Sequence, residues 1–112
     1  MHVVIVQRRQ VQPGLALVTV EGEVDLSTAD RLRDEITAAI DDWHPKEVQV
    51  NLAAVPFMDS MGISALIAGY RAAVASGTVF RVVEPSRPLV SLLEITGLLD
   101  VFGYDSSSSI AR

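Results

Sequence analysis

The sequence predicts a single α/β domain with a mainly parallel sheet. Its 112 residues suit one domain, and 49% hydrophobic with 21% charged residues is the composition of a globular chain. Short apolar or alternating runs are interleaved with segments of helical spacing, in the order β-β-α-β-α-β-α-β. Strands that alternate with helices are joined by crossovers, which make neighbouring strands parallel. We therefore expect four to five strands and three to four helices in residues 1–112, with 105–112 as a frayed tail.

Five segments have the patterns of strands. Residues 3–6 are a β-branched apolar run, and a second run at 15–20 follows a Gln-Pro-Gly turn, which predicts an N-terminal hairpin. Residues 47–52 alternate strictly between polar and apolar positions. Residues 79–83 and the short run at 101–104 complete the expected sheet.

Caps and apolar spacing predict the first and third helices. Ser27 is a favourable N-cap with Asp30 three residues later, and the helix is expected to run to about Asp41. The third helix has Pro88 in its first turn and ends at Gly97. The expected buried residues are Leu32, Ile36, Ala39 and Ile40 in the first helix, and Leu89, Leu92 and Leu93 in the third.

The second helix is expected to begin near Ser60, with Asp59 as its cap, and to end at Gly77. Its expected buried stripe is Ile63, Leu66, Ile67, Tyr70 and Val74. A phosphate on Ser60 would meet backbone N–H groups and the positive end of the helix dipole. On this interpretation the turn before the second helix is an anion-accepting site.

Composition excludes several functional classes. The absence of cysteine excludes disulfides, thiolate metal sites and thiol nucleophiles. A net charge of −5 disfavours nucleic acid as a direct partner. No targeting signal or membrane-length apolar run is visible, so we expect a cytoplasmic protein with no membrane partner. Residues 21–42 contain eight acidic and two basic residues, a net charge of −6, which is typical of a solvated helix face or of an acidic border to a site.

No catalytic constellation is recognisable, so we expect neither an enzyme nor a cofactor. Glycine-rich phosphate loops are missing, and the turn at residues 58–62 lacks the leading glycine of a hydrolase elbow. The two histidines, His2 and His44, lie at a terminus and in a loop, which gives no metal site. A receiver domain needs a late lysine, and the only lysine is Lys46.

The informative stretch runs from Asn51 to Ile63, and with it the sequence resembles the STAS domain family, in particular the anti-sigma factor antagonists. The matching motifs are Gly22-Glu23-Val24-Asp25, the run at 51–58, Asp59-Ser60-Met61-Gly62, and Gly97-Leu98. Many members have a small residue, often Ser, where this chain has Met61. Ser60 is therefore the only hydroxyl in the motif.

The resemblance implies a switch. In that family the serine after the aspartate is phosphorylated by a partner that is both an anti-sigma factor and an ATP-dependent serine kinase. The unphosphorylated form binds this partner and frees its sigma factor, and a phosphatase restores binding after phosphorylation. By resemblance Ser60 is the acceptor, and the partner-binding residues are Glu23, Asp25, Thr28, Asp59, Ser60, Met61, Gly62 and Ser64.

Other interpretations stay open at this point. Asp59 and Ser60 also fit an ordinary capped helix, and Asp25 an ordinary turn. The runner-up function is a non-phosphorylated STAS subunit of a lipid-transport or stress-signalling scaffold assembly. A small-molecule or nucleotide-binding domain ranks lower because no phosphate loop is present. Both a monomer and a weak homodimer are compatible with the sequence.

Overall fold

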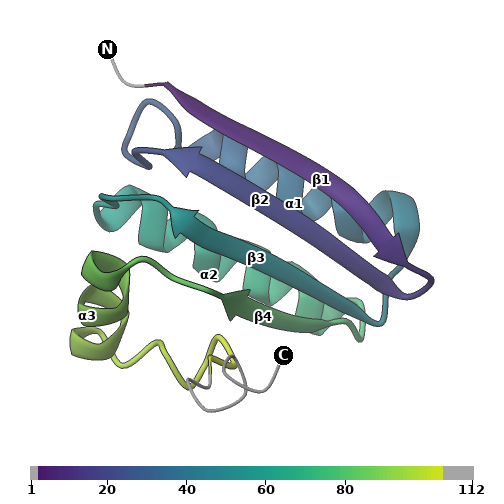
Figure 1. Ribbon diagram of the computed structural model, residues 1–112. Helices are drawn as coiled ribbons and strands as arrows, with labels where there is room; N and C mark the ends of the chain where they lie inside the picture. Colours follow the sequence, from purple (N-terminus) through teal and green to yellow (C-terminus); the bar gives the residue numbers. More distant parts are fainter. Residues whose placement is uncertain (1–2, 105–112) are drawn as a thin grey trace.

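A computed structural model describes residues 3–104 as one layer of helices packed on one sheet (Figure 1). The elements in chain order are β1 Val4–Gln12, β2 Leu15–Gly22, α1 Ala29–Trp43, β3 Glu47–Ala54, α2 Ser60–Ala75, β4 Val79–Val83 and α3 Arg87–Ile95. The sheet order is β1-β2-β3-β4, with β1 antiparallel to β2 and the other pairs parallel. The predicted α/β fold with an N-terminal hairpin is confirmed, with four strands and three helices in the described part.

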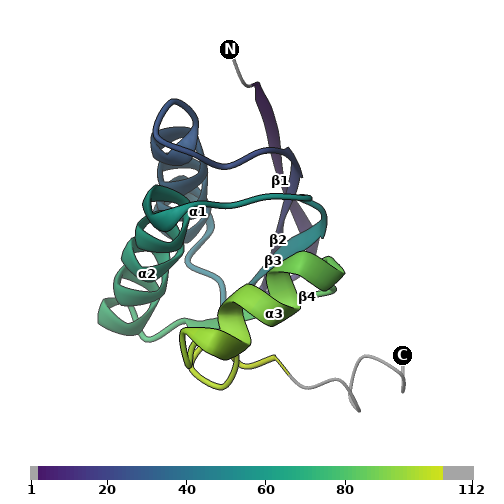
Figure 2. The ribbon, with the colours of Figure 1, turned by 90° about the vertical axis from the view of Figure 1, so that its left-hand side faces the viewer.

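Helices α1 and α2 lie side by side on one face of the sheet, and α3 lies beyond the end of β4 (Figure 2). The core forms where alternate strand residues meet these helices. Val18, Val50 and Val82 lie in register on β2, β3 and β4, and each is fully buried. Because successive strand residues point to opposite faces, the polar residues between them lie on the other face of the sheet.

The two long helices are in direct contact at Gly69. A Cβ atom at Gly69 would lie 2.8 Å from Cγ2 of Ile36, so a side chain there would overlap α1. The buried residues of α2 are Gly62, Ala65, Leu66, Gly69 and Ala73. The predicted stripe was therefore partly wrong: Ile63, Ile67 and Tyr70 are half-buried, and Val74 is 59% exposed. Small residues allow the helices to approach closely, and this turns the buried face away from Val74.

The predicted strand at 101–104 was wrong. These residues form turns, in which Phe102 donates its N–H to Leu98 and Gly103 donates to Asp100. Gly103 has a φ of +68°, which is incompatible with an extended strand. One backbone bond reaches the sheet, from the N–H of Val82 to the carbonyl of Phe102. The apolar pattern instead places Phe102 in the core, 5.4 Å from the ring of Phe80.

Several element boundaries also differ from the prediction; β2 and β3 each extend two residues further, to Gly22 and Ala54. β1 continues to Gln12 because its polar residues pair with β2 through a register that ends in a bulge between Gln10 and Gln12. α1 begins at Ala29 with Thr28 as N-cap, one residue later than the predicted cap. It ends at Trp43, two residues later than predicted, where His44 adopts the left-handed conformation. The predicted tail at 105–112 lies outside the described residues.

Among residues 3–104, no helix is both long enough and apolar enough to cross a membrane.

Candidate functional site

The N-terminus of α2 is capped by Asp59. Its Oδ1 atom accepts the backbone N–H groups of Met61 at 2.9 Å and Gly62 at 3.2 Å. Its carbonyl accepts the N–H of Ile63 at 3.1 Å. The predicted Asp59 cap is therefore confirmed, and its carboxylate already binds two of the N–H groups that a phosphate on Ser60 was expected to meet. A second anion here would compete with a carboxylate.

Ser60 is the first residue of α2, and its side chain is exposed. It directly follows the capping carboxylate, so its hydroxyl group is both accessible and close to an existing negative charge. Ser64 lies one helical turn later and is also exposed. Met61, between them in sequence, is 41% exposed.

A backbone bridge joins the turn before α2 to the loop before α1. Val24 and Met58 form an isolated parallel bridge, in which the N–H of Val24 donates to the carbonyl of Phe57 at 3.1 Å. The N–H of Asp59 in turn donates to the carbonyl of Val24, also at 3.1 Å. Because the bridge is parallel, the residues that follow Val24 and Met58 leave it in the same direction. The loop that contains Asp25 therefore runs alongside the turn that contains Asp59.

Gly62 allows this bridge to lie against α2. A Cβ atom at Gly62 would overlap Cγ of Met58 and lie 3.0 Å from the carbonyl oxygen of Val24. Both contacts are shorter than real Cβ atoms tolerate without movement of the neighbours. Gly62 is buried, and its function in the site is therefore to permit close packing of backbone.

Thr28 holds the loop before α1 in shape. Its Oγ1 atom accepts the N–H of Asp25 at 2.9 Å and donates to the carbonyl of Glu23 at 2.8 Å. Oδ1 of Asp25 accepts both the N–H and the hydroxyl of Ser27, at 3.0 and 2.8 Å. Thr28 is 6% exposed, so it acts from beneath the loop. Its hydrogen bonds orient the half-buried Asp25.

The chain matches a known protein family. A family model described as the STAS domain matches residues 7–111. The chain belongs to the STAS domain family.

The STAS domain has named relatives of similar length. The anti-sigma F factor antagonist of Paenibacillus polymyxa is 28% identical over 94 residues, which cover 83% of this chain and 80% of the relative. A crystal structure of an anti-sigma factor antagonist from Mycobacterium paratuberculosis matches with a TM-score of 0.80 and 26% identity, covering 97% of this chain and 92% of that one.

A third match shows a shared fold. The Bacillus cell fate determinant SpoIIAA, solved in its phosphorylated form, has a TM-score of 0.67 and 21% identity, covering 96% of this chain and 98% of that one.

The structure brings the predicted site residues of this STAS domain to one end of the sheet. The partly or fully exposed ones are Glu23, Asp25, Asp59, Ser60, Met61 and Ser64. Gly62 and Thr28 are buried beneath them and position the two loops. In residues 3–104, no group of three or more His, Asp or Glu side chains is arranged to hold a metal ion.

Sequence reasoning missed two exposed apolar residues of the STAS domain at this end. Leu26 is 74% exposed in the loop before α1, and Phe57 is 48% exposed in the loop before α2. Phe57 adjoins the backbone bridge, and Leu26 follows Asp25. For Leu26 the available signal was a large apolar residue between Asp25 and Ser27, whereas Phe57 lies in an apolar run that gives no such signal. Exposed aromatic and aliphatic side chains with a polar rim are typical of protein-binding surfaces.

Proposed function

We propose that this STAS domain is an anti-sigma factor antagonist whose binding is switched off by phosphorylation of Ser60. The unphosphorylated chain binds an anti-sigma factor that is also an ATP-dependent serine kinase, and so releases the sigma factor. The kinase transfers the γ-phosphoryl group of ATP to the Ser60 oxygen, leaving ADP, and a phosphatase removes it by hydrolysis. The domain itself acts by binding in the cytoplasm.

The position of Ser60 carries this proposal. The residue is exposed, begins α2, and follows a carboxylate that already occupies the helix N-terminus. The names of the relatives in Paenibacillus polymyxa and Mycobacterium paratuberculosis support the antagonist activity. The phosphorylated form named for SpoIIAA supports a phosphorylation switch in a protein of the same fold.

Electrostatics explains how one phosphate can end binding without unfolding the domain. A phosphoserine adds a charge of roughly −1.5 to −2 at neutral pH. Two unit charges about 4 Å apart repel by about 4 kcal/mol at an effective dielectric constant of 20. Exposure to solvent reduces this value, but a loss of about 1.4 kcal/mol already weakens binding tenfold.

The exposed apolar residues Leu26, Phe57 and Met61 supply the contact area for a protein partner. The acidic residues Glu23, Asp25 and Asp59 surround them and favour a basic partner surface. A phosphate on Ser60 would add negative charge within this surface. The expected result is loss of the complex, because the phosphate would repel the nearby carboxylates and would have to lose its hydration in the interface.

The direct test uses purified protein, ATP and each kinase-like anti-sigma factor encoded in the same genome. Mass spectrometry is expected to locate one phosphate at Ser60, and none in Ser60→Ala. Calorimetry is expected to show Ser60→Ala binding like wild type and Ser60→Asp binding at least tenfold more weakly.

Two matched variants separate charge from other effects. Ser60→Asn has the size of Ser60→Asp without its charge and is expected to bind more tightly than Ser60→Asp. Ser91→Asp adds the same charge on an exposed position of α3 and is expected to bind like wild type. Equal affinities of Ser60→Asp and Ser60→Asn, or phosphate at another residue, would overturn the switch.

A further inference from the structure

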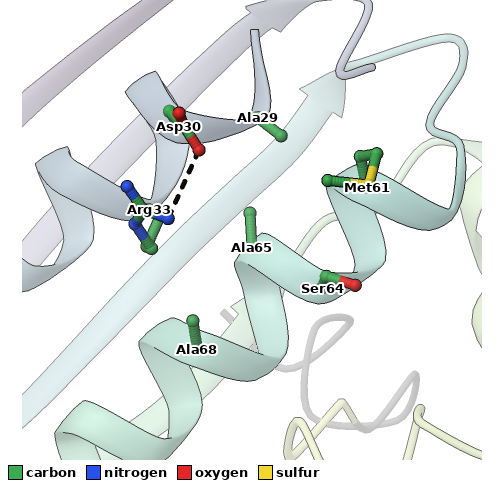
Figure 3. A pocket seen from close by; sticks show the side chains of 7 residues that line it. All are labelled: Ala29, Asp30, Arg33, Met61, Ser64, Ala65 and Ala68. Carbon is green, nitrogen blue, oxygen red and sulfur yellow. Dashed lines mark ion pairs between the residues drawn. The ribbon is translucent and has the colours of Figure 1, made fainter. Parts of the chain in front are cut away.

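A narrow groove separates the first turns of α1 and α2. It has a volume of about 80 Å³, and Figure 3 shows side chains from both helices around it. The lining residues are Ala29, Asp30 and Arg33 of α1, and Met61, Ser64, Ala65 and Ala68 of α2. Met61 and Ser64 lie at the end of the groove near the start of α2 (Figure 3). The groove therefore begins one residue after Ser60.

Side-chain size explains why the groove exists. At Gly69 and Ile36 the helices are in direct contact, because even a Cβ atom would overlap there. Nearer the N-termini the facing residues are Ala29, Ala65 and Ala68, which are too short to fill the space between the helix axes. The result is an apolar wall formed by methyl groups.

The charges at the rim exclude an anionic occupant. Arg33 pairs with Asp30 at 3.3 Å and with Asp34 at 3.2 Å, so its positive charge is already balanced. The Asp30 side chain is 80% exposed at the opening. The surrounding segment, residues 21–42, has eight acidic and two basic residues. A neutral side chain flanked by basic residues is the occupant that this surface favours.

We infer that the groove binds one aliphatic side chain of a basic segment of the anti-sigma partner. This inference rests on the proposed function and extends its binding surface from Ser60 along α2. A water molecule needs about 10–15 Å³ of such space, so the groove has room for several. Its volume is about half that of the roughly 150 Å³ cavity that binds benzene, so it suits an aliphatic side chain of three or four carbons better than an aromatic ring.

An occupant of the groove would also account for the exposed side chain of Met61. Its flexible thioether side chain forms one end of the groove and is 41% exposed. The partner's side chain would cover it on binding. Met61 and Ser64 then contribute to partner selection, whereas Ser60 controls whether the partner stays bound. A basic residue next to the aliphatic one would lie close to Asp30.

Filling the groove tests the inference. Ser64→Leu closes the groove from an exposed position, and Ala68→Leu fills it from the side. Ala75→Leu makes the same change at an exposed position near the other end of α2, outside the groove. Calorimetry with the anti-sigma factor that binds wild type is expected to show at least tenfold weaker binding for both filled variants. Ala75→Leu is expected to remain within twofold of wild type.

The controls distinguish this inference from the proposed function. Circular dichroism and thermal unfolding establish that each variant is folded. Ser64→Leu replaces an exposed residue, so it tests the groove even if Ala68→Leu does not fold. If Ser64→Leu binds the partner as tightly as wild type and still loses binding on phosphorylation of Ser60, the groove does not bind a partner side chain. The proposed function would then be unaffected. Failure of the wild-type chain to bind any anti-sigma factor would overturn both.

A double-mutant cycle identifies the occupant. Truncating the partner's inserted aliphatic residue to alanine is expected to weaken binding of the wild-type chain about tenfold, but to have little further effect on Ser64→Leu. Equal effects of every partner truncation in both backgrounds would contradict insertion. If Ser64→Leu instead changes self-association of this chain in sedimentation and leaves partner affinity unchanged, the groove is a contact between copies and the inference is wrong.

Discussion

The backbone N–H of Asp59 donates to the carbonyl of Val24 at 3.1 Å, and this bond joins the cap of α2 to the loop before α1. The same Asp59 binds the first N–H groups of its helix through Oδ1. The exposed acidic and apolar residues of both loops are thereby fixed relative to Ser60. Displacing Asp59 would disturb the helix cap and the neighbouring loop together.

Removing the cap is expected to destabilise the domain. Asp59→Ala deletes the acceptor of the Met61 and Gly62 N–H groups, which costs about 1 kcal/mol of unfolding free energy. Asp59→Asn keeps an acceptor oxygen and is expected to lose less. Urea unfolding at neutral pH measures both. Equal stability of Asp59→Ala and wild type would show that the cap contributes nothing.

A methyl group at Gly62 is expected to separate the bridge from α2. Alanine favours the helix by about 1 kcal/mol over glycine, but overpacking typically costs about 1–3 kcal/mol. Because the added methyl group would overlap Cγ of Met58 and lie 3.0 Å from the Val24 carbonyl oxygen, overpacking is the larger effect. Gly62→Ala should therefore lower the unfolding midpoint. Ser64→Ala, on the exposed side of the same helix, should leave it unchanged or raise it slightly.

The buried hydroxyl of Thr28 is expected to matter for stability and for loop order. Thr28→Val keeps the shape of the side chain but leaves the N–H of Asp25 and the carbonyl of Glu23 without this partner, at a cost of about 1–3 kcal/mol. Hydrogen exchange at the Asp25 amide should become faster. Thr28→Ser retains the hydroxyl and should behave nearly like wild type. Unchanged exchange in Thr28→Val would contradict this assignment.

Arg8 is expected to stabilise the packing of β1 against α1. Its guanidinium contacts Glu35 at 3.2 Å and Asp42 at 2.8 Å, and lies 5.2 Å from the centre of the Trp43 ring. Partly exposed ion pairs and cation–π contacts contribute modestly, so Arg8→Ala should lose about 1 kcal/mol, and less in high salt.

The matched control for Arg8 is Arg9→Ala. Arg9 is exposed, and successive strand residues point to opposite faces, so its side chain faces away from α1. Urea unfolding of both variants at low and high salt makes the comparison. Equal losses for the two arginines would argue against the specific contacts of Arg8.

The sequence predicted the order of elements because its signals were local and strong. Strict alternation in β3 and the Asp59 cap of α2 depend on neighbouring residues alone. The prediction of a strand at 101–104 was wrong because a short strand and a turn that buries one aromatic ring can have the same apolar pattern. Only the position of Phe80 and the φ of Gly103 distinguish the two.

The site was predicted less completely than the fold. Its acidic residues and Ser60 belong to a recognisable motif. Its cap Asp59 was also predicted, whereas the exposed positions of Leu26 and Phe57 depend on how the two loops pack, which sequence spacing does not determine. The groove is likewise invisible in the sequence, because it arises where small residues of α1 and α2 face each other across the helix pair.

The carbonyl of Phe102 has a consequence for solubility. The outer strands of the sheet are β1 and β4, and open strand edges are templates for aggregation. Phe102 occupies the N–H of Val82 on β4, whereas β1 has two arginines in its middle and a bulge near its end. Both edge strands are therefore less able to pair with strands of other molecules. Under the proposed function the domain leaves one complex before it enters another, and blocked edges let its free form accumulate without adding strands to its neighbours.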